Sequence, residues 1–425
     1  MNAPEFYPPR LNPLLVRVSQ ALAPWLIRQL YWVELDIGQT SLQRLSQVQQ
    51  QRVILLPNHP TFHDPLVMFL LSARLQQPFY YLAAYETFRN TRTMFSITGR
   101  FALLRSLADA EFLQQIFRGF VQRMGMYSIR RGLADRASIA QTLNLLVQSA
   151  CHLVIFPEGG CSFQNDTVMP FRAGGIQMAF QAMNRFAKQR EPLPDLYAVP
   201  VTIKYIYVQD MELAIQNSLK RLEQVLELTA GDGTLYDRLR SVAGTVLARI
   251  EQDYGIAISE TEAQSWNQRI DALKLQVIQK CEHQFGLQPA PGELMRERVY
   301  RVQDALRQRD DDPGEQTEPD LSQATVEKAI SRLLNFDAIY DGYVATDPTP
   351  ERFLDTLTRL EREVFNIDQP PPKGFRRAKV QVGEPLNLKD YFDSYRHDRY
   401  GTVQKLVSQL QQEVQTTLDC YPISV

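Results

Sequence analysis

Short apolar runs that alternate with longer helical segments limit what this 425-residue chain can fold into. Runs such as Arg52–Leu56 and Cys151–Phe156 are rich in aliphatic and β-branched residues, which is typical of buried strands. Because strands that alternate with helices are joined by crossover connections, the sequence predicts an α/β fold with a mainly parallel central sheet flanked by helices. The predicted strands are residues 33–37, 52–56, 78–84, 126–131, 151–156, 196–203 and 378–382, and the predicted helices around them are residues 40–49, 66–75, 88–123, 138–149, 174–190 and 400–418.

A long helical region interrupts this alternation. From Met211 to about Asn366 the strand-like runs vanish and helical segments take their place. An acidic stretch at Asp310–Asp320, which contains proline and glycine, interrupts this region and predicts an exposed, flexible loop. Strand alternation returns after the prolines at 370–372, so we interpret the region as an insertion into one α/β domain; a separate C-terminal domain is the simpler alternative. The predicted helices of this region are residues 219–228, 236–254, 265–285 and 325–334. The predicted parts are an amphipathic N-terminal helical segment (1–32), an α/β domain (33–210), a large helical insertion (211–372) and a closing strand with a C-terminal helix (373–425).

Composition excludes several classes of protein. A net charge of -2 gives no overall signal for nucleic acid, so we expect no nucleic-acid partner. The four cysteines have no Cys-x-x-Cys spacing, which indicates free thiols and neither a zinc site nor a disulfide framework. The N-terminus lacks the basic and apolar regions of a secretory signal, and no window of about 20 residues is free of charge. We therefore expect a cytoplasmic protein with no metal and no spanning helix.

The most apolar N-terminal segment, Leu11–Leu35, has its leucines near helical spacing. Trp25 and Trp32 are amphipathic aromatics, and Arg17 and Arg28 lie among the apolar residues. Such a helix can lie in a membrane interface, which would make the protein peripheral on the cytoplasmic face of a membrane. A helix packed on the domain's own core or on a partner subunit has the same spacing, so the pattern does not separate the two interpretations.

The most informative stretch follows the strand Arg52–Leu56 and contains His59 and Asp64. The two residues lie across a strand-to-helix turn, where the carboxylate can hold one imidazole nitrogen and leave the other free as a base. An unperturbed imidazole pKa of about 6.5 lies near neutral pH, so the pair suits deprotonation of a substrate hydroxyl, with no serine or cysteine nucleophile. The alternative is that both are cap and turn residues at the start of a helix.

A second polar motif, Pro157–Gly160, follows the strand Cys151–Phe156. Loops at the carboxyl ends of parallel strands face the same crevice. We therefore expect this motif to lie near His59.

Together these motifs resemble those of the glycerolipid acyltransferase family, which includes glycerol-3-phosphate and lysophosphatidate acyltransferases. The resemblance covers roughly residues 30–208 and 378–392 and leaves the helical region unmatched. The matching blocks are Asn58-His59-x4-Asp64, Gly125-x5-Arg131, Phe156–Gly159 and Val199–Val201, in this order, and Val382–Leu386 resembles the closing strand.

The resemblance implies that His59 takes the proton of an acceptor hydroxyl while Asp64 orients the imidazole. The resulting oxygen would attack an acyl thioester carried by coenzyme A or acyl carrier protein, with no other cofactor and no covalent acyl-enzyme. His63 is a rival base, and we assign it to packing or substrate contact.

The resemblance also implies which residues bind the substrates. Arg131 would hold the phosphate of the acceptor through a bidentate guanidinium contact. Glu158 and Gly159 would shape the acceptor site, and Asn58 and Gly125 would line it.

The third block departs from the family pattern. Where the family commonly continues Glu-Gly-Thr-Arg, this chain has Gly160 and Cys161 after Glu158-Gly159. Arg172 falls where the family often has a basic residue and would compensate in part. A lysophospholipid or an alcohol without phosphate therefore stays open as the acceptor.

The leading prediction is an O-acyltransferase that acts on a lipid acceptor at a membrane surface. The same fold could instead serve as a noncatalytic lipid-binding or scaffold protein, although the intact His59 and Asp64 argue against this. A third class is hydrolysis of a thioester or lipid ester by water that His59 activates. No Gly-x-Ser-x-Gly nucleophile elbow occurs near a strand end.

Overall fold

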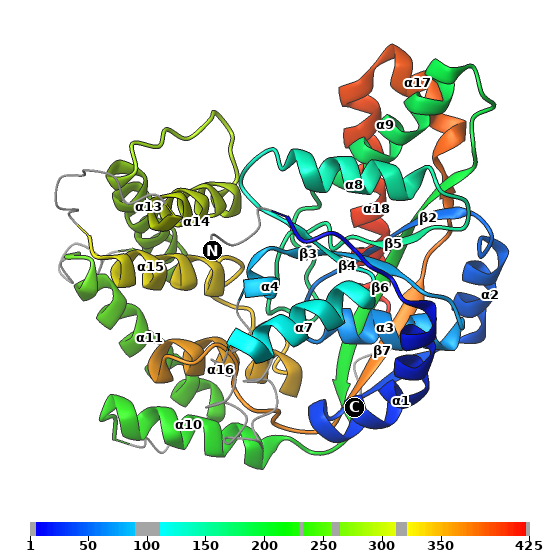
Figure 1. Ribbon diagram of the computed structural model, residues 1–425. Helices are drawn as coiled ribbons and strands as arrows, with labels where there is room; N and C mark the ends of the chain where they lie inside the picture. Colours follow the sequence, from blue (N-terminus) through cyan, green and yellow to red (C-terminus); the bar gives the residue numbers. More distant parts are fainter. Residues whose placement is uncertain (1–5, 90–110, 230–232, 257–263, 312–320, 422–425) are drawn as a thin grey trace. The chain divides into compact units, whose positions relative to one another are not determined.

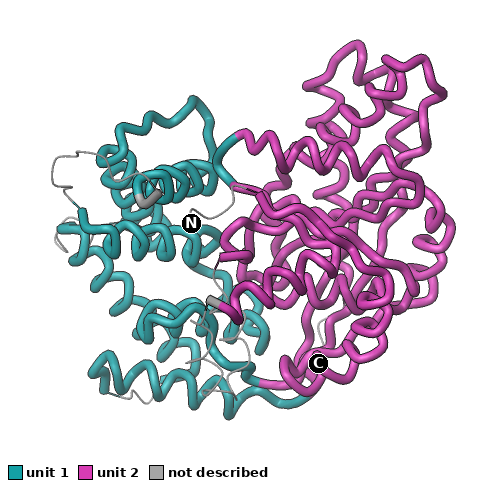
Figure 2. Tube along the Cα trace, viewed as in Figure 1, with its two compact units in different colours: residues 1–3, 131–133, 209–373 teal, residues 4–130, 134–208, 374–425 magenta. Residues whose placement is uncertain are grey.

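The computed structural model describes residues 6–89, 111–229, 233–256, 264–311 and 321–421, and these divide into two compact units (Figures 1 and 2). The sheet unit comprises Pro4–Arg130, Ala134–Val208 and Gly374–Val425. The helical unit comprises Arg131–Leu133 and Gln209–Lys373. None of the described helices is long and apolar enough to cross a membrane.

The sheet unit contains an eight-stranded sheet whose strands follow the order β1-β7-β6-β2-β5-β3-β4, with β8 paired to β6. Strands β6, β2, β5, β3 and β4 are parallel to one another, whereas β7 is antiparallel to β6 and parallel to β1. The predicted mainly parallel α/β fold is thus confirmed. The strands are β1 (Val33–Ile37), β2 (Arg52–Pro57), β3 (Tyr80–Ala84), β4 (Met126–Ile129), β5 (His152–Val154), β6 (Leu196–Tyr207), β7 (Arg376–Val382) and β8 (Leu386–Asn387).

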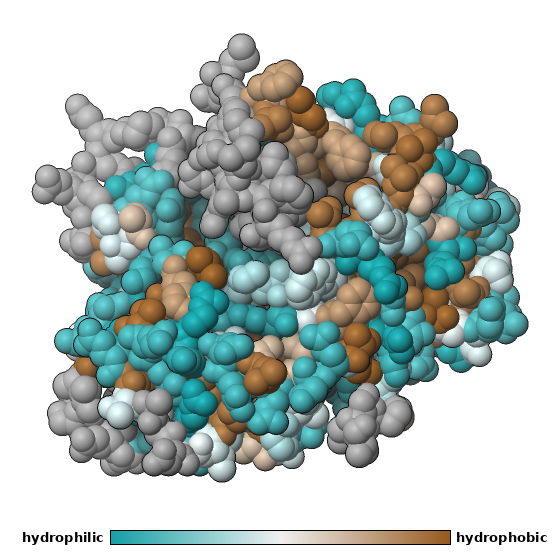
Figure 3. Space-filling model, turned by 90° about the horizontal axis from the view of Figure 1, so that it is seen from below, coloured by the Kyte–Doolittle hydropathy of each residue, from teal (hydrophilic) through white to brown (hydrophobic). Residues whose placement is uncertain are grey.

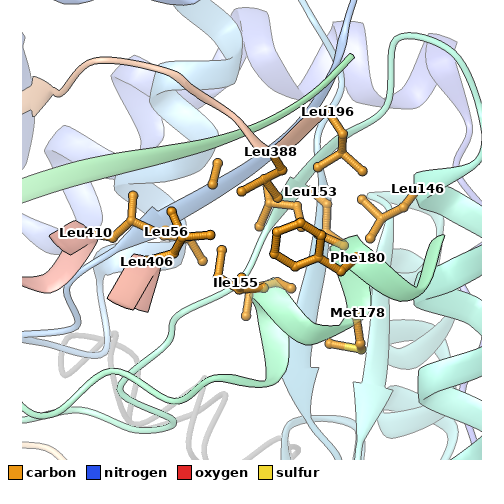
Figure 4. Close-up of a cluster of buried hydrophobic side chains, with 14 of the residues drawn as sticks. Leu56, Leu146, Leu153, Ile155, Met178, Phe180, Leu196, Leu388, Leu406 and Leu410 are labelled. Atoms are coloured by element: carbon orange, nitrogen blue, oxygen red, sulfur yellow. The ribbon is translucent and has the colours of Figure 1, made fainter. Parts of the chain in front are cut away.

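Helices cover both faces of this sheet, and β2 shows why. Its side chains alternate between the faces, so Ile54 and Leu56 pack with residues of α9 and α18 while Val53 and Leu55 pack with residues of α1 and α3. Figure 4 shows Leu56 beside Leu406 and Leu410 in the first of these cores. The helices of the unit are α1 (Pro13–Tyr31), α2 (Gln39–Gln47), α3 (Asp64–Arg74), α4 (Glu86–Arg89), α7 (Glu111–Arg123), α8 (Arg136–Leu146), α9 (Gly174–Gln189), α17 (Phe392–His397) and α18 (Arg399–Asp419), with a 3-10 turn at Leu388–Tyr391.

Several element ends differ from the prediction. The strand predicted over 126–131 ends at Ile129, so Arg130 and Arg131 lie beyond it. The helix predicted from Leu66 begins at Asp64, with Pro65 in its first turn, where a missing N–H costs no hydrogen bond. The helix predicted over 88–123 is described as α4 and α7, and residues 90–110 lie outside the described residues.

The helical unit lies between β6 and β7 in sequence. At the point where the chain leaves and re-enters the sheet, the Val208 N–H donates to the Phe375 carbonyl at 3.2 Å, so the two ends of the insertion meet. Of the predicted acidic loop, residues 312–320 lie outside the described residues and α14 includes Asp311. The helices are α10 (Glu212–Leu226), α11 (Leu235–Asp253), α13 (Trp266–Gln284), α14 (Met295–Asp311), α15 (Gln323–Asn335) and α16 (Pro350–Phe365). Helices α14 and α16 lie in the predicted helical region but were not among the segments named for it.

A recurrent ion pair joins successive helices of this unit. A glutamate near the end of one helix accepts two hydrogen bonds from an arginine of the next, as in the Glu251–Arg269 pair, with N···O distances of 3.0 and 2.6 Å. The backbone carbonyl of the same glutamate also accepts from the N–H that follows the helix, which closes the last turn. The three pairs are Glu223–Arg238, Glu251–Arg269 and Glu282–Arg298.

Candidate active site

The two polar motifs meet at the carboxyl ends of adjacent strands. Strands β2 and β5 are parallel neighbours, and the loops that follow them touch. The His59 N–H donates to Glu158 Oε1 at 2.6 Å, and the Ser162 N–H donates to the His59 carbonyl at 2.8 Å. The sheet topology therefore brings His59 and the Pro157–Gly160 motif together.

His59 and Asp64 form a hydrogen-bonded pair. The distance from His59 Nδ1 to Asp64 Oδ2 is 2.7 Å, and Asp64 is fully buried at the first position of α3. A carboxylate only accepts, so Nδ1 carries the proton of this bond and Nε2 is left as the basic nitrogen of the neutral ring. The His59 ring also stacks on Phe156, with centroids 4.2 Å apart, so the imidazole is held on two sides.

Asp64 is itself held by three further donors. The N–H and the hydroxyl of Thr61 donate to it at 2.9 and 3.0 Å, and the Tyr205 hydroxyl donates to Oδ1 at 2.7 Å. Burial and the nearby Asp64 charge keep the pKa of Tyr205 well above its usual value, so the phenol stays protonated and remains a donor. Sequence reasoning did not identify Tyr205, because it lies far away in the chain on β6.

Two asparagines fasten the site loops to β6. Asn58 exchanges two hydrogen bonds with the backbone of Ile203, at 2.9 and 2.7 Å, and Asn165 does the same with Tyr205, at 2.6 and 2.7 Å. Both asparagines are buried. Asn58 thus bonds to backbone groups of the sheet, and it positions the loop that carries His59.

A thiol that the sequence prediction left out lies against the imidazole. Cys161 Sγ is 3.5 Å from His59 Nε2 and 3.8 Å from His59 Nδ1. The signal in the sequence was the departure from the family's third block, where Cys161 stands in the position of the expected arginine. The contact itself spans the strands β2 and β5 and could not be read from spacing.

The groups around His59 shift the pKa of its imidazole. Burial alone lowers the pKa of His59, but the Cys161 sulfur and the Asp64 carboxylate outweigh burial and hold this pKa well above its usual value. The imidazole therefore has a stronger tendency to hold a proton than a free histidine has.

Glu158, Gly159 and Arg172 belong to the same loop cluster. The second carboxylate oxygen of Glu158 accepts from the Met169 N–H at 3.1 Å, so this buried side chain bridges two backbone segments. Gly159 has φ 75°, and a Cβ there would lie 2.5 Å from Arg172 Cζ. Glycine suits this position because its φ lies in the left-handed region, and the absence of a side chain lets the guanidinium of Arg172 pack over the backbone.

The second block of the resemblance, Gly125-x5-Arg131, does not lie at the same end of the sheet as the block that holds His59. Gly125 precedes the amino end of β4, whereas His59 follows the carboxyl end of the parallel strand β2. A Cβ on Gly125, with φ 89°, would lie 2.7 Å from the Phe79 carbonyl, which accounts for glycine locally. Arg131 belongs to the helical unit, where it donates to the Tyr300 hydroxyl at 3.0 Å and lies 4.2 Å from the centroid of that ring.

His63, the rival base, is buried and packed against neighbouring side chains. It is buried at the start of α3, its ring meets Tyr31 edge-on, and the Arg376 guanidinium donates to its Nδ1 at 3.1 Å. Burial and the Arg376 charge hold the pKa of His63 well below its usual value, so it stays neutral. Among the described residues, no cluster of three or more His, Cys, Asp or Glu side chains is arranged to hold a metal ion.

Comparison with known proteins identifies the domain. The model of the Acyltransferase family matches residues 99–204, which span the second, third and fourth blocks and begin after the block that holds His59 and Asp64. A search of curated proteins finds no match to the chain. The match and the mainly parallel sheet agree, and residues 99–204 form an acyltransferase domain, of the family of the glycerolipid acyltransferases.

Proposed function

We propose that the protein is an O-acyltransferase that moves a fatty acyl group from acyl-CoA or acyl carrier protein to a hydroxyl of a glycerophospholipid precursor. Glycerol 3-phosphate, lysophosphatidate and lysophospholipids are the candidate acceptors. The observation that carries the proposal is the hydrogen bond between His59 Nδ1 and Asp64, on the same sheet whose later strands β4 and β5 lie in the residues 99–204 that match the Acyltransferase family.

His59 is the general base of the proposed reaction. With Nδ1 committed to Asp64, its Nε2 takes the proton of the acceptor hydroxyl, and the oxygen attacks the carbonyl carbon of the donor thioester. Asp64 then stabilises the imidazolium, and the thiol of the donor leaves with a proton from it. Because a thioester is an activated donor, positioning and one base suffice.

Arg172 is the best placed cation for an acidic acceptor group. Its guanidinium packs against Gly159, in the loop that also contacts His59. Arg131 stays a proposed acceptor-binding residue from the resemblance, and its contact with Tyr300 supports a fixed guanidinium orientation.

Two helices of the sheet unit support a membrane surface as partner. Along α1 the large apolar side chains of Leu14 and Trp25 are 75% and 65% exposed, and on α7 Phe112 is 70% exposed. The amino end of α1 meets the carboxyl end of α7, because the Asn12 N–H donates to the Arg123 carbonyl at 2.8 Å. Figure 3 views the molecule from the side on which α1 lies, and brown apolar side chains interrupt the hydrophilic surface there. The exposed apolar residues of this α1–α7 surface are Leu14, Val18, Leu22, Trp25, Leu26, Phe112, Ile116 and Phe120.

The test of the reaction is acyl transfer by the purified protein in lipid vesicles, with the three acceptors and both kinds of donor. We expect a product that depends on the acceptor and that falls by about 10²–10⁴-fold in His59→Ala, since this is the usual contribution of a general base. Product formation that survives this substitution would exclude His59 as the base. Acyl release without any acceptor would favour the hydrolase, and no reaction at all would favour a lipid-binding protein.

Membrane association is tested separately by co-sedimentation with anionic vesicles. The double substitution Leu22→Asp and Trp25→Asp places charges on the apolar face of α1, so we expect bound protein to fall by about tenfold or more. Leu213→Asp in α10 is the matched control, because Leu213 is 73% exposed but lies outside the α1–α7 surface. Equal loss of binding in both variants would contradict the assignment.

A further inference from the structure

We propose that the helical unit binds a long acyl chain with an anionic head group in an apolar cavity between α11 and α13. The inference goes beyond the proposed acyl transfer. All the residues that line this cavity in the described part of the chain belong to the helical unit, whereas His59 and Asp64 belong to the sheet unit. The proposal is carried by the apolar lining, the length and the charges of the cavity.

The cavity lies between two helices that pack against different neighbours. Helix α11 packs against α10 and α16, and helix α13 packs against α14 and α15. One face of α11 and one face of α13 line the space between them. This space, including the part that is open to solvent, is about 970 Å³, and ligand pockets typically have about 300–1,000 Å³.

Apolar side chains make up most of the lining. On both helices they recur every three or four residues, so that one stripe of each helix faces the cavity. Apolar walls offer water few hydrogen-bond partners, and the cavity therefore favours an apolar occupant. The stripes include Leu239, Ala243, Val246 and Ile250 of α11 and Ile270 and Leu273 of α13.

The stripe on α11 has the length of an acyl chain. From Leu239 to Ile250 the helix rises by about 16 Å, since each residue adds about 1.5 Å. A single layer of acyl chains fills one leaflet of a bilayer, which is about 15 Å of the hydrocarbon core. An acyl chain laid along α11 would thus be in contact with apolar side chains over most of its length.

The charged side chains that line the cavity favour an anionic head group. They are three cations, Arg240, Lys274 and Arg332, and one carboxylate, Asp341. Arg240 is paired with Asp341, and Arg332 is paired with two further carboxylates. The partner of Lys274 is Asp271, whose side chain is 75% exposed, so solvent screens this pair and an anion can compete for the ammonium group.

The cavity opens to solvent beside Arg240 and Tyr340. Both line it, the Arg240 side chain is 35% exposed, and Tyr340 is 41% exposed. Trp266 lies at the same end, with the centroid of its ring 4.3 Å from Arg240 Cζ. A ligand can therefore enter without unfolding of the helices, and Trp266 can report its arrival.

The first experiment uses Trp266 as a fluorescent reporter. The chain has three tryptophans, so the background variant with Trp25→Phe and Trp32→Phe retains Trp266 alone. We titrate this variant with a long-chain fatty acid that is brominated in mid-chain, below its micelle concentration. Because bromine quenches an indole only at short range, we expect saturable quenching at one molecule per chain. No quenching, with the wild-type fold by circular dichroism, would overturn the proposal.

Two alanines locate the bound chain. Ala243 lines the cavity, whereas Ala272 is exposed on α13 and does not line it. In the reporter background, Ala243→Phe fills the cavity and should raise the Kd by about tenfold or more, and the matched variant Ala272→Phe should leave it unchanged. Equal Kd values in the two variants would place the fatty acid elsewhere and overturn the cavity as its site.

The head group and the chain are tested by changing the ligand. Lys274→Gln should weaken binding of the brominated acid by about tenfold and leave binding of the brominated alcohol of the same chain unchanged. Each methylene removed from the chain should raise the Kd by about fourfold. Equal effects of Lys274→Gln on acid and alcohol would overturn the anionic head group, and a Kd independent of chain length would overturn the acyl chain.

Competition identifies the source of the acyl chain. Displacement of the brominated acid by unlabelled fatty acid alone would assign the cavity to free fatty acids. Displacement by an acyl-CoA or a lysophospholipid as well would assign it to the acyl chains of larger amphiphiles. Binding should persist in His59→Ala, so that the outcome does not depend on the proposed reaction.

Discussion

The proposed role of Asp64 is to orient the His59 imidazole through a hydrogen bond. Replacing its carboxylate by the amide of asparagine tests this role. In Asp64→Asn the amide can donate to Nδ1, which favours the ring tautomer whose Nε2 carries the proton. We expect kcat to fall by about 10³–10⁴-fold, as for the equivalent change in a serine-protease triad. A variant with the wild-type fold by circular dichroism and unchanged kcat would contradict the pairing.

The pH profile separates this role from a merely structural one. Since the Asp64 carboxylate raises the pKa of His59, its loss should move the acidic limb of the kcat/KM profile of any residual activity to lower pH. Tyr205→Phe, which removes one donor to Asp64 but keeps the ring, should cost about 1.5–3 kcal/mol of transition-state stabilisation if the donor acts through Asp64. The measurement is the rate of acyl transfer from pH 5 to pH 9.

The sequence was sufficient to predict contacts between site residues that are close together in the chain. His59 and Asp64 share one turn, so their contact followed from spacing. Tyr205 and Cys161 reach the same pair only through the neighbouring strands β6 and β5, and no local pattern marks such contacts. Arg131 shows the reverse, because a residue at the expected end of its strand is held by Tyr300 of the helical unit.

At the scale of elements, the repeated glutamate–arginine pairs stabilise the helical unit. Glu251 is fully buried in α11, and its partner Arg269 lies mostly buried in α13. Removing one partner leaves the other charge buried, so we expect Arg269→Met to lower the free energy of unfolding by about 3–5 kcal/mol. Urea unfolding monitored by circular dichroism measures the change.

The matched control is the exposed pair Arg28–Glu34, in which the arginine side chain is 57% exposed. Arg28→Met should change the free energy of unfolding by less than about 1 kcal/mol, because solvent screens such pairs. Equal changes in the free energy of unfolding would show that the buried pair stabilises the protein no more than the exposed pair does.

Helices α14 and α16, which the sequence analysis did not name, differ in the strength of their apolar periodicity. Helix α16 buries Phe353, Leu354, Leu357 and Leu360 at helical spacing, so its pattern was sufficient to find it. Helix α14 is mostly charged, and one of its arginines, Arg298, bonds to Glu282 of the preceding helix. A polar helix that depends on such ion pairs has a weak apolar period, and the sequence alone does not reveal it.

For the whole molecule, buried histidines predict sensitivity to acid. His152 lies in the central strand β5, where burial lowers its pKa to about 4. Below about pH 6.5 the unfolded chain binds a proton that the folded protein does not, so stability falls with pH until the folded pKa is reached. His152 alone should cost about 2 kcal/mol between pH 8 and pH 5.

His152→Phe isolates this contribution, because phenylalanine keeps an aromatic ring beside Phe79 and cannot titrate. The difference in free energy of unfolding between wild type and variant should change by about 2 kcal/mol from pH 8 to pH 5, in favour of the variant at low pH. A difference that is constant over this range would mean that His152 titrates normally.

The meeting of Val208 and Phe375 at the base of the insertion has a consequence for the order of folding. Strand β7 leaves the ribosome only after the helical unit, and among the described strands β1 pairs with β7 alone. The entropy cost of closing a loop grows only with the logarithm of its length, and an insertion that folds first brings its ends together in advance. We therefore expect β1, the first strand to be synthesised, to be the last to join the sheet.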